Sequence, residues 1–124
     1  EIQYLRHLDG RSYFNGPLVI LTSKASASAA EIVAQALQDY GTAIVVGDER
    51  TYGKGTIQYQ TVTDSAATSF FKVTVGRYYT VSGRSTQIEG VKADIIVPTA
   101  YSALNIGERY LEYPLKSDRV PSAY

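Results

Sequence analysis

Two short apolar runs with one amphipathic helical pattern between them constrain the fold of this chain more than any other feature. Residues 17–21 and 43–46 are apolar runs bounded by glycine and polar residues, a pattern typical of strands that are buried on both faces. From Ala29 onward, apolar residues recur at three- and four-residue steps for about three turns, and Gly41 is placed to cap the C-terminal end of a helix. Strand, helix and strand in this order predict a right-handed crossover between parallel strands.

The second half of the chain is richer in predicted strands, because alternating, β-branched and aromatic residues dominate it. The predicted elements are strands at 56–62, 70–81 and 93–98, a loop at 64–69, a turn at 82–85 and a weak helix at 101–111, with an irregular end.

The whole pattern predicts a mixed α/β fold with a sheet, one main helix and several β-hairpins. The 124 residues, 44% of them apolar, suffice for the core of one domain and not of two. We expect residues 1–124 to form a single domain with 99–124 as a C-terminal extension. Because the chain contains no methionine, even at position 1, we expect it to be a piece of a longer protein.

Charge and cysteine content exclude several classes of function. Twelve basic and twelve acidic residues cancel and no basic stripe stands out, so nucleic acid and anionic membranes are not expected partners. The absence of cysteine excludes disulfides, thiol catalysis and zinc–thiolate sites. No apolar run reaches the roughly 20 residues that span a bilayer.

A glycine-rich loop with a Gly-Lys pair, GDERTYGKGT at residues 47–56, shares features with the phosphate-binding P-loop. Five residues separate Gly47 from Gly53 where a P-loop has four, and Gly55 follows Lys54 in place of Ser or Thr. No helical pattern follows to present its N-terminus to a phosphate. Nucleotide binding is therefore not expected, and from the loop alone Lys54 would be an exposed lysine.

Three serines precede the predicted helix, and Ser28 has two interpretations. Ser28-Ala-Ala-Glu31 fits a capping box, in which the serine oxygen accepts from the helix and the glutamate reaches back to the serine amide. A serine that follows a buried strand at a helix N-terminus also has amides nearby that stabilise an oxyanion. The cap and the nucleophile share one location, so the pattern leaves both open. Ser23 and Ser26 are expected to be loop serines.

A nucleophilic serine needs a general base. The only histidine, His7, lies in the charged opening segment, which argues against a Ser-His-Asp triad. A lysine serves instead when its amine is neutral, the form that burial favours. Lys54 lies between two glycines that let the backbone pass close to a neighbour, whereas the other lysines are expected on the surface. A Ser28–Lys54 dyad is chemically possible but not required by the residues.

Two long motifs stand on either side of the second predicted strand: SASAAEIVAQALQDYG at residues 26–41 and GDERTYGKGTIQ at residues 47–58. Two further segments are SGRSTQIEGVKADIIVP at 82–98 and LNIGERYLEYPLKSDRV at 104–120. Together these segments resemble the protease core of the carboxyl-terminal processing proteases, also called tail-specific proteases, and the segment that follows it in the Gram-negative branch. Ala93 stands where the family pattern usually has proline.

The resemblance implies a role for individual residues. Ser28 matches the nucleophile, Lys54 the general base, and Gln58 the residue that orients the lysine in relatives with a Ser-Lys-Gln arrangement. The backbone amide of Ala29 matches one donor of the oxyanion hole, and the other donor belongs to an upstream glycine-rich loop without a counterpart here. Asp39 matches an acidic position of the family, which we interpret as structural, with a supporting catalytic role as the alternative.

The resemblance further implies a crotonase-like or Clp protease-like ββα core and a serine endopeptidase that needs no metal or cofactor. The implied substrates are proteins and peptides with apolar C-termini, and the implied location is periplasmic, in the bacterial cell envelope. Nucleic acid and nucleotides are not expected to bind, and homo-oligomers are compatible with the family. The alternative is a non-catalytic peptide-binding module or an inactive fragment of such a protease, because the family's N-terminal part and PDZ domain have no counterpart in these residues.

Overall fold

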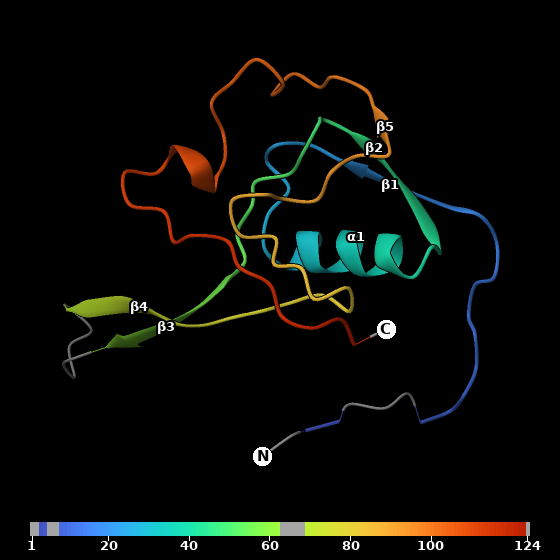
Figure 1. Cartoon of the computed structure of the whole chain (residues 1–124), viewed down its shortest axis with the longest axis horizontal. Helices are drawn as coiled ribbons and strands as arrows, with labels where there is room; N and C mark the ends of the chain where they lie inside the picture. The colour runs from blue at the N-terminus through green and yellow to red at the C-terminus, as the bar shows by residue number, and fades with distance from the viewer. Residues whose placement is uncertain (1–2, 5–7, 63–68, 124) are drawn as a thin grey trace.

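A strand, a helix and a second strand form the first half of the chain, as the sequence pattern predicts. β1 (Leu18–Thr22), α1 (Ala29–Asp39) and β2 (Ala43–Gly47) follow one another, and β1 pairs with β2 in parallel (Figure 1). β5 (Ile95–Ile96) adds a parallel strand beside β2, which makes the sheet order β1-β2-β5. The computed structural model describes residues 3–4, 8–62 and 69–123, so the inferences about His7 and most of the 64–69 loop lie outside the described residues.

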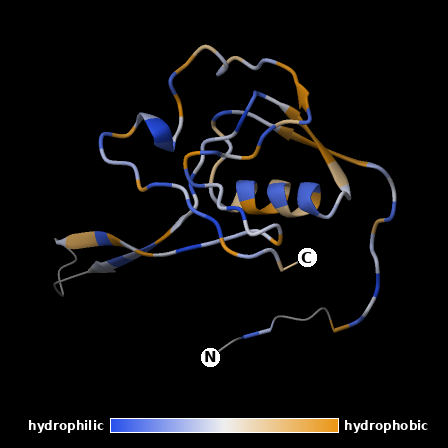
Figure 2. Ribbon diagram, in the orientation of Figure 1, coloured by the Kyte–Doolittle hydropathy of each residue, from blue (hydrophilic) through white to orange (hydrophobic). Residues whose placement is uncertain are grey.

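The helix covers one face of this sheet only. Ala34 of α1 packs with Val45 of β2 and with Val91 in the buried core. Figure 2 shows hydrophilic and hydrophobic residues alternating round α1, as an amphipathic helix requires. The prediction that the two strands are buried on both faces is wrong for this chain, because the side chains that point away from α1 remain exposed. They are Val19 (56% exposed), Leu21 (80%) and Ile44 (48%).

The second pair of strands forms an antiparallel hairpin. β3 (Thr56–Val62) and β4 (Phe70–Arg77) project away from α1 (Figure 1), and their ladder is irregular between Ile57 and Gln58. β3 begins directly after the Gly53-Lys54-Gly55 sequence, so the hairpin is attached to the end of that loop.

Two of the predicted strands are shorter than the sequence indicates. The strand predicted over 70–81 ends at Arg77, because a turn follows in which Thr80 N donates to Arg84 O at 2.9 Å. The strand predicted over 93–98 is reduced to β5, although Val97 N still donates to Gly47 O at 2.7 Å.

The weak helix predicted over 101–111 is wrong except for its last turn, the 3-10 helix η1 (Glu108–Tyr110). The physical reason lies in a lysine from another part of the chain. Lys24 Nζ donates to Ser102 O at 2.6 Å and to Leu104 O at 3.0 Å, so these carbonyls bond a side chain in place of helical amides.

The extension nevertheless contacts the rest of the chain closely. The Asp48 carboxylate accepts hydrogen bonds from Thr99 N at 2.9 Å and from the hydroxyl of Ser102. Burial raises the pKa of Asp48, but hydrogen bonds from Ser102, Thr99 and Lys24 outweigh it and hold the pKa well below its usual range.

The mixed α/β fold with one main helix is confirmed. In the described part of the chain, no helix is long and apolar enough to cross a membrane.

Candidate active site

Ser28 occupies the N-cap of α1 in a strained backbone conformation. Its φ of 56° and ψ of −115° lie in a region that residues with a side chain rarely adopt, at a cost of about 1–3 kcal/mol. The Ser28 amide donates to Glu31 Oε2 at 2.9 Å, which is the glutamate half of the predicted capping box. Among the described residues, nothing accepts a hydrogen bond from the amide of Ala29, the predicted oxyanion donor.

The Gly53-Lys54-Gly55 turn is tied to the same glutamate. Lys54 N donates to Glu31 Oε2 at 2.9 Å, and Gly53 N donates to Glu31 Oε1 at 2.6 Å. The hydroxyl of Thr51 donates to Oε1 as well. One oxygen of a single carboxylate therefore bonds the backbones of both Ser28 and Lys54.

Glu31 is the residue whose importance sequence reasoning missed. It is fully buried, and its four donors replace the water that a carboxylate loses on burial. The capping pattern indicated its contact with Ser28 only. Its partners in the loop are 20 or more positions away in the sequence, and no local pattern indicates contacts at that separation.

Tyr78 contacts the same turn through the carbonyl oxygen of Lys54. The phenol donates to Lys54 O at 2.6 Å, and its oxygen lies 2.7 Å from Thr86 Oγ1. Burial raises the pKa of Tyr78; the contact with Thr86 lowers it in part, and the charge of Glu31 raises it further. The phenol thus keeps the proton that it donates to Lys54 O.

The residues of the predicted dyad meet at one pocket of about 330 Å³. Ser28, Lys54 and Gln58 all line it, from the N-terminus of α1, the turn and β3. Among the described residues that line it there is no carboxylate. Among the described residues, no hydrogen bond joins Ser28 Oγ to Lys54 Nζ. The other lining residues are Ile32, Thr56, Ile57, Lys72 and Tyr78.

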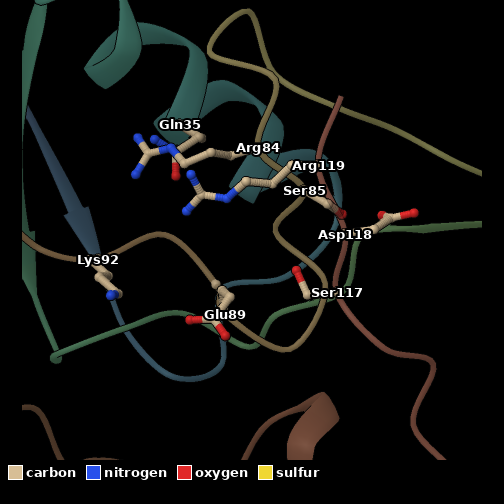
Figure 3. A pocket seen from close by; sticks show the side chains of 9 residues that line it. Gln35, Arg84, Ser85, Glu89, Lys92, Ser117, Asp118 and Arg119 are labelled. Atoms are coloured by element: carbon tan, nitrogen blue, oxygen red, sulfur yellow. The ribbon is translucent and has the colours of Figure 1, made fainter. Parts of the chain in front are cut away.

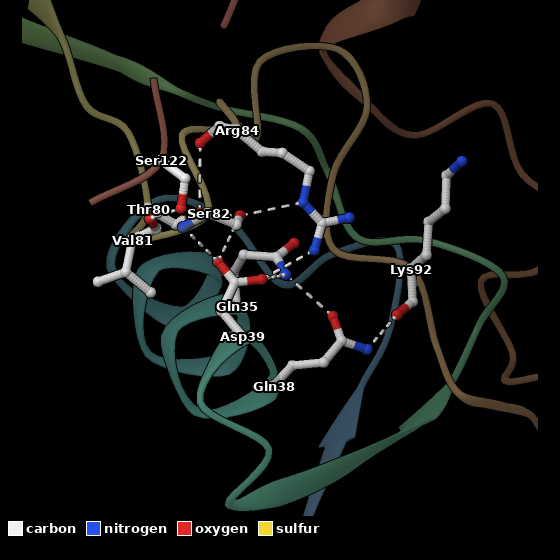
Figure 4. A network of polar contacts seen from close by, with 9 residues as sticks. All are labelled: Gln35, Gln38, Asp39, Thr80, Val81, Ser82, Arg84, Lys92 and Ser122. Atoms are coloured by element: carbon white, nitrogen blue, oxygen red, sulfur yellow. Dashed lines mark hydrogen bonds and ion pairs between the residues drawn. The ribbon is translucent and has the colours of Figure 1, made fainter. Parts of the chain in front are cut away.

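Asp39 lies at the opposite end of α1 from Ser28, roughly 16 Å away along the helix axis at a rise of about 1.5 Å per residue. Its carboxylate accepts from Arg84 Nη2 at 2.8 Å and from Ser82 Oγ at 2.7 Å (Figure 4). Burial raises the pKa of Asp39, but hydrogen bonds from Thr80, Ser82 and Arg84 with the Arg84 charge lower it to about 2. The structure places Asp39 in this network and not in the pocket with Ser28.

A second pocket, of about 60 Å³, lies beside the Asp39 network. It is lined by charges of both signs, with Arg84 and Arg119 close together (Figure 3). No residue of the predicted dyad reaches it. Within the described residues, there is also no cluster of histidine, cysteine and acidic side chains suited to hold a metal ion. The pocket lined by Ser28, Lys54 and Gln58 is the candidate active site because it brings these three predicted residues together.

Comparison with known proteins identifies the family of this chain. Residues 3–97 match the family described as peptidase family S41. The chain is 36% identical over 121 residues to the tail-specific protease of Haemophilus influenzae, covering 93% of this chain and 17% of that protein. It is 37% identical over 106 residues to the carboxy-terminal-processing protease of Bartonella bacilliformis, covering 81% of this chain and 24% of that protein.

A solved structure of a C-terminal processing protease is also similar to this chain. The photosystem II D1 C-terminal processing protease superposes with a TM-score of 0.59 at 40% identity, over 72% of this chain and 22% of that one. The chain thus spans about a fifth of the length of the proteins that it resembles. The resemblance found in the sequence motifs is confirmed.

Proposed function

This chain belongs to peptidase family S41, and on that premise we propose that the enzyme containing it is a serine endopeptidase with Ser28 as nucleophile and Lys54 as general base. The observation that carries the proposal is the single buried carboxylate of Glu31, which bonds the backbones of both residues at the pocket they share. Gln58, on the first strand of the hairpin, is proposed to orient the lysine amine.

The proposed reaction is hydrolysis of a peptide bond in two steps. Neutral Lys54 Nζ removes the proton from Ser28 Oγ, and the oxygen attacks the scissile carbonyl carbon. The tetrahedral intermediate collapses, its carbon–nitrogen bond breaks, and the Lys54 ammonium returns the proton to the leaving amine. Water, deprotonated by the same amine, then attacks the acyl ester and releases the carboxylic acid with regeneration of Ser28.

The oxyanion of the intermediate is proposed to accept a hydrogen bond from the backbone amide of Ala29. This amide has no acceptor within the described residues and lies at the positive end of α1. A second donor would come from a part of the enzyme outside this chain. Loss of one such donor typically costs about 10²–10³ in turnover, so the isolated chain is expected to be a poor enzyme.

The proposed substrates are proteins cleaved from apolar C-terminal tails, in the bacterial cell envelope. Support for the tails comes from the names of the relatives, which act as tail-specific or carboxy-terminal-processing proteases. The cellular location is supported by the family resemblance.

Mass spectrometry of a protein substrate with an apolar tail tests the proposal in the full-length enzyme. Ser28→Ala and Lys54→Ala are expected to abolish cleavage, and Lys54→Arg is expected to do the same, because it keeps a cation that cannot act as a base at neutral pH. Arginine thus separates the loss of a base from the loss of a positive charge. Cleavage at the wild-type rate by Ser28→Ala or by Lys54→Ala would contradict the dyad.

The alternative, a peptide-binding module without catalysis, makes a different prediction in the same assay. One observation favours it: within the described residues, Ser28 Oγ and Lys54 Nζ are not hydrogen bonded. If the alternative holds, the full-length wild-type protein binds the tailed substrate and leaves it intact.

A further inference from the structure

The Gly53-Lys54-Gly55 turn has a second support, which comes from Gln87. This glutamine is fully buried, and both ends of its side-chain amide are bonded. Oε1 accepts from Gly55 N at 3.0 Å, while Nε2 donates to Glu108 Oε1 at 3.2 Å and to Leu115 O at 3.0 Å. Gln87 therefore joins the residue after Lys54 to the C-terminal extension.

The two glycines around Lys54 allow this contact, because the backbone of 87–88 approaches them closely. A Cβ atom at Gly55 would lie 2.6 Å from Gln87 N, and one at Gly53 would lie 2.9 Å from the carbonyl of Ile88. Ile88 N also donates to Gly53 O at 2.8 Å. The turn and the segment carrying Gln87 are thus in direct backbone contact on both sides of Lys54.

The extension also reaches the residue at the other end of the turn. Glu108 N donates to Tyr52 O at 2.9 Å, and the Glu108 side chain accepts from Gln87. Glu108 and Leu115 lie outside residues 3–97, the part of the chain that matches the peptidase family. Tyr52 precedes the turn and Gly55 ends it, so the extension holds the turn at both ends.

We propose that Gln87, held in place by Glu108, is a positioning residue that sets the place of the Lys54 amine relative to Ser28. This inference rests on the proposed function, because it assigns a consequence to the position of the general base. A turn that loses this support lets the amine drift from the hydroxyl, and a misplacement of about 1 Å costs on the order of 10² in rate. Gln87 does not line the pocket, so substrate binding is not expected to change.

The first test is Gln87→Leu in the full-length enzyme, with rates normalised to the folded fraction measured by circular dichroism. The variant leaves the buried amide of Gly55 without an acceptor. We expect kcat to fall at least about tenfold with KM within about twofold, and the pH at which activity reaches half its plateau to move. The matched control is Gln38→Leu, which also removes a bond from a glutamine to a backbone carbonyl, that of Lys92 at 2.9 Å, away from the turn. The control is expected to leave kcat and the pH profile unchanged.

A pair of charge variants decides the question if Gln87→Leu does not fold. Gln87→Glu keeps an acceptor for Gly55 N but places a second carboxylate against Glu108, so kcat is expected to fall. Adding Glu108→Gln returns a donor to this contact, and kcat is expected to recover in the double variant relative to Gln87→Glu alone. If the effects of the two substitutions on kcat simply add, the proposal is overturned.

Ser28→Ala separates this inference from the proposed function. If Ser28→Ala is inactive while Gln87→Leu keeps kcat within twofold of wild type, the positioning role is wrong and the dyad stands. If Ser28→Ala cleaves normally, the proposed function fails, and the positioning role fails with it.

Discussion

Replacing Glu31 by glutamine tests the central feature of the site with the smallest possible change in shape. The carboxylate accepts four hydrogen bonds, from Ser28 N, Lys54 N, Gly53 N and the Thr51 hydroxyl. A glutamine amide has one acceptor oxygen and an NH₂ group, so it can accept from about half of these donors. In its best orientation the oxygen keeps Ser28 N and Lys54 N, the Thr51 hydroxyl turns to accept, and Gly53 N loses its partner.

The magnitude follows from these bonds. A buried amide without an acceptor costs about 1–3 kcal/mol. The two remaining bonds become neutral, and each loses about 1 kcal/mol of charge assistance. The sum is about 3–5 kcal/mol, a large fraction of the roughly 5–15 kcal/mol that stabilises a typical domain. We expect activity to fall as well, because the hydrogen bonds by which residue 31 holds the backbones of Ser28 and Lys54 are weakened.

The assay is urea unfolding followed by circular dichroism, with peptide cleavage measured on the same samples of the full-length enzyme. Glu49→Gln is the matched control, since Glu49 is an exposed glutamate in a surface pair with Arg50, and its unfolding midpoint is expected to stay unchanged. An unfolding free energy of Glu31→Gln within about 1 kcal/mol of wild type would refute the argument from the four bonds.

Three further predictions follow from single residues. Ser28→Gly and Ser28→Ala are both expected to be inactive, but glycine at a φ of 56° is expected to be more stable by about 1 kcal/mol, and equal melting temperatures would contradict the strain assigned to Ser28. The pKa of Asp39 is about 2, below its unfolded value of about 3.9, so its contribution of about 2 kcal/mol is present above pH 4 and is lost as the pH falls toward 2. Asp39→Asn should therefore flatten stability measured between pH 4 and 2, and identical pH dependence in both proteins would disprove this. Tyr78→Phe leaves Lys54 O without its donor and is expected to cost about 1 kcal/mol and to lower kcat, whereas unchanged thermal unfolding would show that the bond contributes nothing.

The local elements of the fold could be predicted from the residues because their causes are local. The apolar steps of α1, the cap at Ser28 and the alternation of β3 all depend on neighbours within a few positions. The weak helical pattern over 101–111 failed for the opposite reason. There, a lysine about 80 positions earlier in the chain bonds the carbonyls that a helix would have used.

The candidate site was predictable in its parts but not in its construction. Two motifs indicated Ser28 and Lys54, and the structure brings both to one pocket with Gln58. The assignment of Asp39 was ambiguous from its motif position, because an acidic residue at a helix end has the same pattern whether it serves the site or an ion pair. Its partner Arg84 is 45 positions away in the sequence, beyond the range of any periodic pattern.

By itself, the sequence determined the order of strand, helix and strand, the strained serine's place at the helix start, and the glycines that flank Lys54. Only the tertiary structure decided that Glu31 bonds both catalytic candidates, that Gln87 links their turn to the extension, and that one face of the sheet stays exposed. The physical reason is range. Periodicity and capping act over three or four residues, whereas the bonds to Gly53 and Gly55 span 22 and 32 positions and exist only once the loops pack together.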